Sequence, residues 1–369
     1  MQEPPPRAWV ETDVEAIAHN LAVVRSAADN MMQMPVVKAN AYGHGLEPVA
    51  RRLDAEDVAF FGVANVHEAR RLQKAGVRTR PFILGPTLPD EREEVVLNDW
   101  GCTISTLAEA EHLHSLAALH GRVFAAQMAL ETGMGREGFL PAELGQVVPQ
   151  LAALSRLRVE GIMSHFSAAD EDGAYTRAQA ALFDACASEV AQHLPLRYRH
   201  IAASAGHLGP YAATCANLAR PGIVLYGVSP LDCPRADRLR PALRLLSRVV
   251  LVRELPAGQG VSYGHTYTTS APTRVATIGI GYADGWPRHL SGRGAYVCIA
   301  GQRCPVLGRV TMDLLIVDAG AVPHVAVGDE VELIGPHLPV QQVAEWAGTI
   351  PWEIFTGLGV RLPRLCKAE

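Results

Sequence analysis

The sequence lacks the features that mark membrane, secreted and nucleic-acid-binding proteins. In 369 residues, no window approaches the roughly 18 uncharged apolar residues of a membrane span. The first residues, MQEPPPRAW, carry neither a basic segment nor an apolar one, so we expect no secretory signal and a cytoplasmic location. The formal net charge is only −5. We therefore expect neither a membrane nor a nucleic acid as a partner.

Cysteine is sparse and irregularly spaced. The seven cysteines never form a C-x-x-C pair. This argues against a disulfide framework and a structural zinc site, and it favours reduced thiols in a cytosol. The sequence also has no H-E-x-x-H motif, so we expect no metal site.

Lysine is the scarcest charged residue. Of 33 basic residues only three are Lys (Lys38, Lys74 and Lys367). Lys74 lies in a polar helical segment and Lys367 near the end of the chain, but Lys38 ends an apolar run. An amine there can lose its proton and act as a nucleophile or a base, which a guanidinium cannot do.

Up to about residue 230, short apolar runs alternate with amphipathic helical segments. Eight such strand–helix units predict an α/β fold, an N-terminal (β/α)8 TIM-type barrel, with an open doubly wound sheet as the competitor. The predicted strands are Pro35–Ala39, Val58–Val63, Pro81–Gly85, Gly101–Ser105, Val123–Glu131, Val159–Ser164, Arg199–Ser204 and Gly222–Gly227. The predicted helices include Asp13–Ala28, Val66–Ala75, Thr106–Leu119 and Tyr175–Leu194.

Beyond Pro241 the pattern changes to strands joined by Gly- and Pro-containing turns, followed by two short helices. We therefore expect a mainly β C-terminal domain over residues 236–369, after a barrel over residues 1–235. We leave open whether residues 1–12 pair with the second domain. The predicted strands are Val249–Arg253, Val275–Gly279, Ala295–Ala300, Leu315–Asp318 and Glu330–Ile334, and the helices Val340–Trp346 and Pro351–Phe355.

Polar residues gather at the carboxyl ends of the predicted barrel strands, where TIM-barrel enzymes place their chemistry. They include Lys38, Arg136, His165, Ser204 and Arg220. Taken singly, each has a structural alternative, because His165 can pack in a core and Arg220 can pair with a carboxylate. Together they form a mixed set of one amine, two guanidiniums and one imidazole, which is unlike a metal cluster.

The segment MPVVKANAYGHG around Lys38 closely resembles the cofactor-lysine segment of alanine racemases, which are barrel-plus-β-domain enzymes. Further matching strings follow in order along almost the whole chain: ETGMGREGF, SHFSAADE, ARPGIVLYG, VSYGHTY, GYADGWPR, GRVTMDLL and RLPR. The resemblance implies a racemase that uses pyridoxal 5′-phosphate (PLP) to interconvert L- and D-alanine for cell-wall peptidoglycan. The alternatives are a serine or broad-specificity amino-acid racemase, and a catalytically silent PLP-binding protein.

The resemblance also implies catalytic roles. Lys38 would hold PLP through an imine and act as one of two bases, and Tyr263 would be the opposite base, supplied by the partner in a homodimer with shared active sites. His165 would lie beside that tyrosine, with Arg220 beyond it. Arg220 would also face the pyridine nitrogen, where a permanent cation disfavours protonation.

Cofactor and substrate contacts follow from the same matches. The residues implied for PLP binding are Lys38, Tyr42, His165, Ser204, Arg220, Gly222 and Ile223. Those implied for the substrate are Arg136, Met312 and Asp313, and those implied for the entrance are Asp170, Tyr282 and Arg309.

This chain departs from the family pattern beside Arg136. Ala129 stands where many members have a lysine that, once carboxylated, buttresses this arginine, and Glu131 replaces an aspartate. We leave open whether an anion or a water takes the place of the missing carboxylate.

Overall fold

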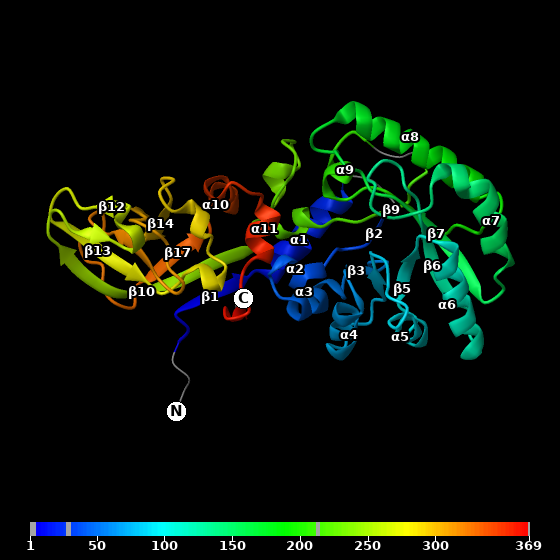
Figure 1. Ribbon diagram of the computed structural model, residues 1–369, viewed down its shortest axis with the longest axis horizontal. Coiled ribbons are helices and arrows are strands. Elements are labelled where there is room, and N and C mark those ends of the chain that lie inside the picture. Colours follow the sequence, from blue (N-terminus) through cyan, green and yellow to red (C-terminus); the bar gives the residue numbers. More distant parts are fainter. Residues whose placement is uncertain (1–4, 27–30, 212–214, 368–369) are drawn as a thin grey trace. The chain divides into compact units, whose positions relative to one another are not determined.

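The computed structural model describes residues 5–26, 31–211 and 215–367. It divides into two compact units. Unit 1 comprises Met1–Val14, Tyr42–Gly45 and Pro241–Glu369, and unit 2 comprises Glu15–Ala41 and Leu46–Arg240 (Figure 1). The last two residues of the predicted helix Asp13–Ala28 lie outside the described residues, as do the outermost residues of both predicted domains.

Unit 2 is a barrel of short parallel strands. A six-stranded sheet in the order β3-β4-β5-β6-β7-β8 and a parallel pair, β2 and β9, build it. Several backbone hydrogen bonds join these sheets, among them one from Val37 N–H to the Gly62 carbonyl at 2.9 Å and one from Arg220 N–H to the Ala202 carbonyl at 3.0 Å. The strands are β2 (Met32–Gln33), β3 (Phe61–Val63), β4 (Pro81–Ile83), β5 (Gly101–Ile104), β6 (Phe124–Ala129), β7 (Leu157–Met163), β8 (Tyr198–His200) and β9 (Leu218–Ala219).

The helices of unit 2 lie outside these strands (Figure 1). They are α1 (Val14–Arg25), α3 (Leu46–Leu53), α4 (Val66–Lys74), α5 (Arg92–Leu97), α6 (Leu107–Leu119), α7 (Leu144–Ala153), α8 (Gly173–Val190) and α9 (Ser204–Leu208). Strands such as β5 and β6 are fully buried because helices cover the outside and side chains fill the inside. The predicted helices Val66–Ala75 and Thr106–Leu119 are confirmed. A capping box between Thr106 and Glu109 fixes the start of α6.

Two predicted strands are wrong. In Pro35–Ala39, only Val36 makes a strand-type bridge, to Gly62, because the chain leaves the extended conformation after Lys38. The run Gly222–Gly227 is a 3-10 helix, η2 (Ile223–Tyr226), and the strand precedes it as β9. An apolar run of four residues suits a buried strand and a buried helical turn equally well, so periodicity cannot separate them.

Unit 1 is organised by one long strand, β10 (Leu243–Leu255), which pairs with β1 (Ala8–Thr12), β13 (Thr273–Ile278) and β17 (Glu330–Ile334). The eight-stranded sheet also contains β14 (Tyr296–Ile299), β15 (Gln302–Pro305), β16 (Leu315–Asp318) and β18 (Arg364–Cys366). The hairpin of β11 (Gly260–Val261) and β12 (Tyr267–Thr268) extends from it, and helices α10 (Val340–Ala347) and α11 (Pro351–Thr356) follow β17. No helix in the described ranges combines the length and hydropathy needed to cross a bilayer.

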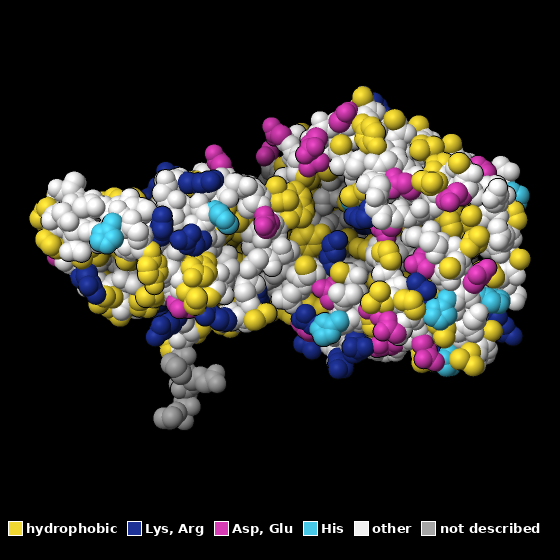
Figure 2. Space-filling model, in the orientation of Figure 1, with side chains coloured by type: hydrophobic (Ala, Val, Ile, Leu, Met, Phe, Trp, Pro, Cys, Tyr) yellow, Lys and Arg dark blue, Asp and Glu magenta, His cyan; other side chains and the backbone are white. Residues whose placement is uncertain are grey.

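The surface of unit 2 carries both signs of charge. On the face drawn in Figure 2, acidic and basic side chains are interspersed over this unit. This distribution agrees with the small net charge and offers no single-sign surface to a polyanion on that face.

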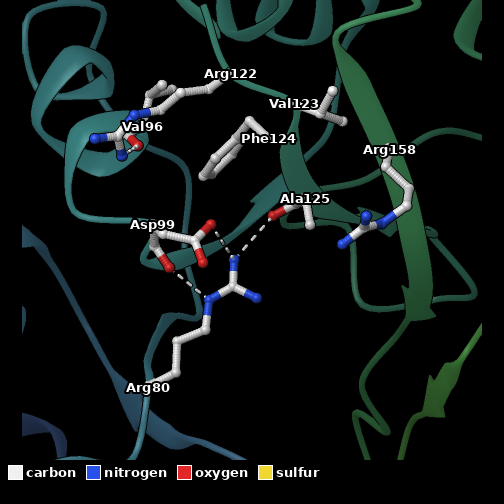
Figure 3. Close-up of a pocket in the computed structure, with 8 residues that line it drawn as sticks. All are labelled: Arg80, Val96, Asp99, Arg122, Val123, Phe124, Ala125 and Arg158. Atoms are coloured by element: carbon white, nitrogen blue, oxygen red, sulfur yellow. Dashed lines mark hydrogen bonds and ion pairs between the residues drawn. The ribbon is translucent and has the colours of Figure 1, made fainter. Parts of the chain in front are cut away.

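A pocket of about 430 Å³ opens where β5, β6 and β7 begin, so it lies at the end of the barrel opposite the strand carboxyl termini. Arg80 crosses it (Figure 3) and donates to the Asp99 carboxylate at 3.2 Å, the Ala125 carbonyl at 3.3 Å and the Glu160 carboxylate at 3.2 Å. Its donors therefore satisfy groups on β6 and β7 and in the turn that precedes β5. This end of a TIM barrel contributes to stability rather than chemistry.

We expect Arg80→Ala to lower the free energy of unfolding by about 3 kcal/mol, because the buried Glu160 carboxylate then loses an ion-pair partner. The partner that remains, Arg158, is more exposed than Arg80. The matched control is Arg78→Ala, whose side chain is 85% exposed and whose loss should cost less than about 1 kcal/mol. Urea denaturation measures both. Equal losses in the two variants would contradict the structural role of Arg80.

Candidate active site

Lys38 stands at the start of a strained turn. Ala39, Asn40, Ala41 and Tyr42 all have positive φ, between 52° and 57°, which is the left-handed region. Left-handed backbone costs roughly 1–2 kcal/mol for each residue that has a Cβ. Four such residues in succession persist only where the surroundings hold them, and strain of this kind concentrates at functional sites.

A polar network in unit 2 holds this turn. The Asn40 N–H and the Ala64 N–H donate to the two carboxylate oxygens of Glu68, at 3.3 Å and 2.9 Å. The Asn40 side-chain oxygen accepts from the Leu46 N–H at 3.1 Å and from Arg71 at 2.8 Å. Glu68 is 7% exposed. The sequence analysis missed this residue, because its partners come from a different strand–helix connection.

The electrostatic surroundings of Lys38 favour its neutral amine. Burial lowers the pKa of Lys38, and the positive charges of Arg136 and Arg220 lower it further, against the opposing effects of Glu68 and Glu137. A lowered pKa increases the share of neutral amine, which is the form that acts as a nucleophile and as a base.

Arg220 is the buried centre of the site. Its side chain is 2% exposed, and its guanidinium donates to His200 Nδ1 at 2.6 Å, His165 Nδ1 at 2.9 Å and the Ser164 carbonyl at 2.6 Å. Burial lowers the pKa of Arg220 to about 9, with a further contribution from Arg136. The group is therefore still protonated at pH 7.

These contacts fix the proton positions on both imidazoles. A guanidinium only donates, so Nδ1 of His165 and of His200 must accept, and each neutral ring carries its proton on Nε2. Burial, together with the charges of Arg220, Arg136 and Lys38, lowers the pKa of His165 to about 3. His165 is thus a neutral ring with its remaining N–H available as a donor.

His200 and Gln127 were missed by the sequence analysis. His200 Nε2 lies 2.5 Å from Gln127 Oε1, and burial keeps the pKa of His200 well below its usual value. The contact spans β7, where a Cβ on Gly161 would lie 2.8 Å from Gln127 Oε1. Only glycine leaves room there, so β6, β7 and β8 together orient the arginine.

The loop after β6 brings Arg136 to the same end of the barrel. The Glu131 carboxylate accepts backbone N–H groups from Gly133, Met134 at 2.6 Å, Gly135 at 2.7 Å and Arg136 at 3.3 Å. Glu131, at the start of this loop, therefore accepts hydrogen bonds from the backbone of the loop and holds its conformation. Arg136 is half exposed and pairs with Glu137 at 3.1 Å.

Further predicted site residues belong to the same unit. Ser204 starts α9, and its Oγ accepts from the Gly222 N–H at 3.0 Å. Ile223 follows as the first residue of η2, where a backbone N–H has no partner within the helix. Asp170 lies exposed in the loop after β7. Tyr42 belongs to unit 1 and is buried, and burial raises the pKa of its phenol to about 12.

Unit 1 presents its predicted residues on exposed turns. Tyr263 is 68% exposed in a short turn, η4 (Tyr263–His265), between β11 and β12. The Ser262 hydroxyl donates to the Arg309 carbonyl at 2.5 Å, which fixes the start of this turn. Tyr263 therefore presents an accessible phenol on this turn.

Met312 and Tyr282 are also exposed, at 52% and 41%. Their loops pack together, since the Tyr282 N–H donates to the Thr311 carbonyl at 3.0 Å. Asp313 is exposed and accepts from Arg361 of the RLPR string at 2.8 Å. The ion pair explains why that string contains an arginine at position 361.

Models of known protein families match both halves of the chain. "Alanine racemase, N-terminal domain" matches residues 12–230, and "Alanine racemase, C-terminal domain" matches residues 242–366. An alanine racemase of Desulfovibrio desulfuricans is 39% identical over 97% of this chain and 97% of its own length.

Solved structures of alanine racemases are also similar to this chain over nearly its whole length. The alanine racemase of Streptomyces lavendulae superposes with a TM-score of 0.93 at 35% identity, covering 100% of this chain and 98% of its own. The alanine racemase of Bartonella henselae, solved with covalently bound pyridoxal phosphate, gives a TM-score of 0.88 at 31% identity and covers 98% of this chain and 100% of its own.

The lowered pKa values of His165 and His200 predict acid-sensitive stability. Unfolding restores each ring to its ordinary pKa of 6.5, so below pH 6.5 the unfolded state binds more protons and the free energy of unfolding falls as pH falls. The expected loss is up to about 1.4 kcal/mol per pH unit for each ring, and for His165 it continues to about pH 3.

Denaturant unfolding between pH 7 and pH 5 measures this slope. His165→Gln should make the slope shallower, whereas His193→Gln, at an exposed position, should leave it as in the wild type. Identical slopes in all three proteins would mean that His165 titrates normally in the folded state.

Proposed function

The chain belongs to the alanine racemase family, and on this premise we propose that it is a PLP-dependent isomerase that interconverts L-alanine and D-alanine. The observation that carries the proposal is the buried Arg220–His165 contact at 2.9 Å, in electrostatic range of Lys38. The same proposal assigns PLP binding to the barrel predicted over residues 1–235 and leaves residues 236–369 as the mainly β domain. Of the barrel range, Met1–Val14 and Tyr42–Gly45 belong to unit 1, where β1 pairs with β10.

The polar groups named above fit PLP. Lys38 supplies an amine with a lowered pKa for the imine, and Arg220 supplies a cation for the pyridine nitrogen. The Ser204 hydroxyl, the backbone of Gly222 and Ile223, and Tyr42 would hold the phosphate. When bound, PLP withdraws electrons from the substrate Cα and so makes its proton removable.

Racemisation requires a base on each side of Cα, and we assign Lys38 to one side and the partner subunit's Tyr263 to the other. A free phenol has a pKa of about 10, so little of the basic phenolate is present at neutral pH. The His165 Nε2–H is directed away from Arg220, because Nδ1 accepts from that arginine. A donor in that position would stabilise a phenolate, so His165 and Arg220 would act together to make the tyrosine basic.

Arg220 would also restrict the reaction. A guanidinium stays protonated at pH 7 and does not transfer its proton to a neighbouring base. Arg220 would therefore leave the pyridine nitrogen unprotonated. That weakens electron withdrawal, which disfavours decarboxylation and transamination and leaves proton exchange at Cα. His200 and Gln127 contribute by holding the guanidinium in place.

Substrate selection would come from Arg136 and unit 1. Arg136 would bind the substrate carboxylate, with the backbone of Met312 as a second donor and Asp313 fixing its loop through Arg361. Asp170, Tyr282 and Arg309 would narrow the entrance and exclude long side chains by size.

We propose a homodimer with two shared sites. The exposed Tyr263, Met312 and Tyr282 of unit 1 support it, because exposed apolar and aromatic side chains favour burial against a partner. All seven cysteines lie in the described residues and are free, which fits a reducing, cytoplasmic setting. We further propose that the D-alanine supplies cell-wall peptidoglycan.

The first test is the absorbance of the purified protein. A band near about 420 nm is expected for a lysine-bound PLP; it should disappear in Lys38→Ala and persist in the control Lys74→Ala. A colourless protein that does not respond to added PLP would refute the assignment of the cofactor.

Chiral chromatography after incubation with L-alanine, L-serine and larger amino acids tests the substrate. We expect the highest kcat/KM with alanine; a higher value with serine would favour the serine or broad-specificity alternative. Deuterium exchange at Cα of alanine in D2O separates an enzyme from a silent PLP-binding protein, which would show none.

Subunit mixing tests the shared site. Lys38→Ala and Tyr263→Phe should each be inactive alone, whereas mixing them should restore activity after subunit exchange, because one site of each heterodimer then has both bases. Proven exchange without recovery would show that each chain builds its own site.

A further inference from the structure

We infer that the carboxylate of Glu137 is the built-in anion that fixes Arg136 for binding the substrate carboxylate. The inference rests on the proposed function and adds a positioning residue to it. Glu137 is the residue directly after Arg136, in a loop where the chain is otherwise largely exposed.

The burial of Glu137 sets it apart from an ordinary surface acid. Its side chain is only 7% exposed, although that of Arg136 is 50% exposed. Oε1 of Glu137 accepts from Arg136 Nη2 at 3.1 Å. Removing a carboxylate from water is costly unless a cation compensates it, so the burial of Glu137 depends on this ion pair.

The second carboxylate oxygen is directed into the protein. Oε2 of Glu137 is buried and has no hydrogen-bond partner among the described residues. Glu137 lines a cavity of about 10 Å³ together with Ala129, Met163 and His165. Such a cavity holds about one water molecule at most, which leaves no room for an additional anion beside Ala129.

The other acid of this cavity is already engaged. Glu131 lines it too, but its two oxygens accept backbone N–H groups of the loop from Gly133 to Arg136. Ala129 offers only a methyl group. Among the residues that line the cavity, Glu137 therefore supplies the negative charge that pairs with Arg136.

The pair also affects the base. The charge of Arg136 lowers the pKa of Lys38, and the charge of Glu137 raises it. The carboxylate thus has two effects, one on the orientation of a half-exposed arginine and one on the protonation of Lys38. Loss of the charge should weaken carboxylate binding and shift the acidic limb of the pH–rate profile to lower pH.

The test compares Glu137→Gln and Glu137→Asp with the control Glu111→Gln, an exposed position on α6. In Glu137→Gln we expect KM for both alanine enantiomers to rise by about tenfold. We expect kcat to change much less, and the acidic limb of kcat/KM to move to lower pH. Glu137→Asp keeps the charge and should recover part of the lost affinity, while Glu111→Gln should match the wild type.

Calorimetric titration of the holoenzyme with propionate gives a readout that needs no turnover. Its Kd should rise in Glu137→Gln by the same factor as KM. An unchanged KM and an unchanged propionate Kd would overturn the inference. A wild type whose propionate affinity depends on Glu137 but that does not racemise alanine would instead overturn the proposed function and leave the inference standing.

Chloride provides a test that does not depend on any variant's folding. Because the carboxylate already occupies the position beside Arg136, exchanging sulfate for chloride at constant ionic strength should leave the wild-type KM unchanged. A wild-type KM that falls as chloride rises would show that an external anion fixes Arg136, which would overturn the inference.

Discussion

The structure of the site depends on one buried cation. Arg220 has almost no contact with solvent, and its donors bind two imidazoles and two backbone carbonyls. Because a guanidinium can only donate, it assigns the proton of each imidazole to Nε2 and keeps both rings neutral. Without this cation, His165 would lose the donor that fixes its tautomer. The Gln127 contact across Gly161 would then have no group to orient.

The strained turn after Lys38 complements this rigid centre. Four residues with positive φ turn the chain after Lys38 away from the path that a continuing strand would take. The strain is offset by the Glu68 carboxylate and the Asn40 amide, which satisfy backbone donors of two separate loops. Preorganisation of this kind places the amine before any ligand arrives, so binding need not supply the energy to order it.

Positive charge dominates the end of the barrel where Lys38, Arg136 and Arg220 lie. Burial, and then the repulsion between these charges, lowers the pKa values of Lys38, His165 and Arg220, while Glu68 and Glu137 limit the effect on Lys38. Such a site attracts anions, which fits a phosphate-bearing cofactor and a substrate carboxylate. The side chains of Glu68 and Glu137 are both buried. Glu68 holds the turn after Lys38, and Glu137 pairs directly with Arg136.

The sequence by itself determined the elements whose patterns are local. Strands β16 and β17 have the predicted bounds, and α4 and α6 carry their caps within one helical turn. Motif strings with fixed spacing identified the family and Lys38. Only the tertiary structure decided that Gly222–Gly227 is helical, that His200, Gln127 and Glu68 belong to the site, and that Glu137 is buried. These facts depend on which strands and loops become neighbours when the barrel closes, and contacts between distant segments leave no periodic signal in the sequence.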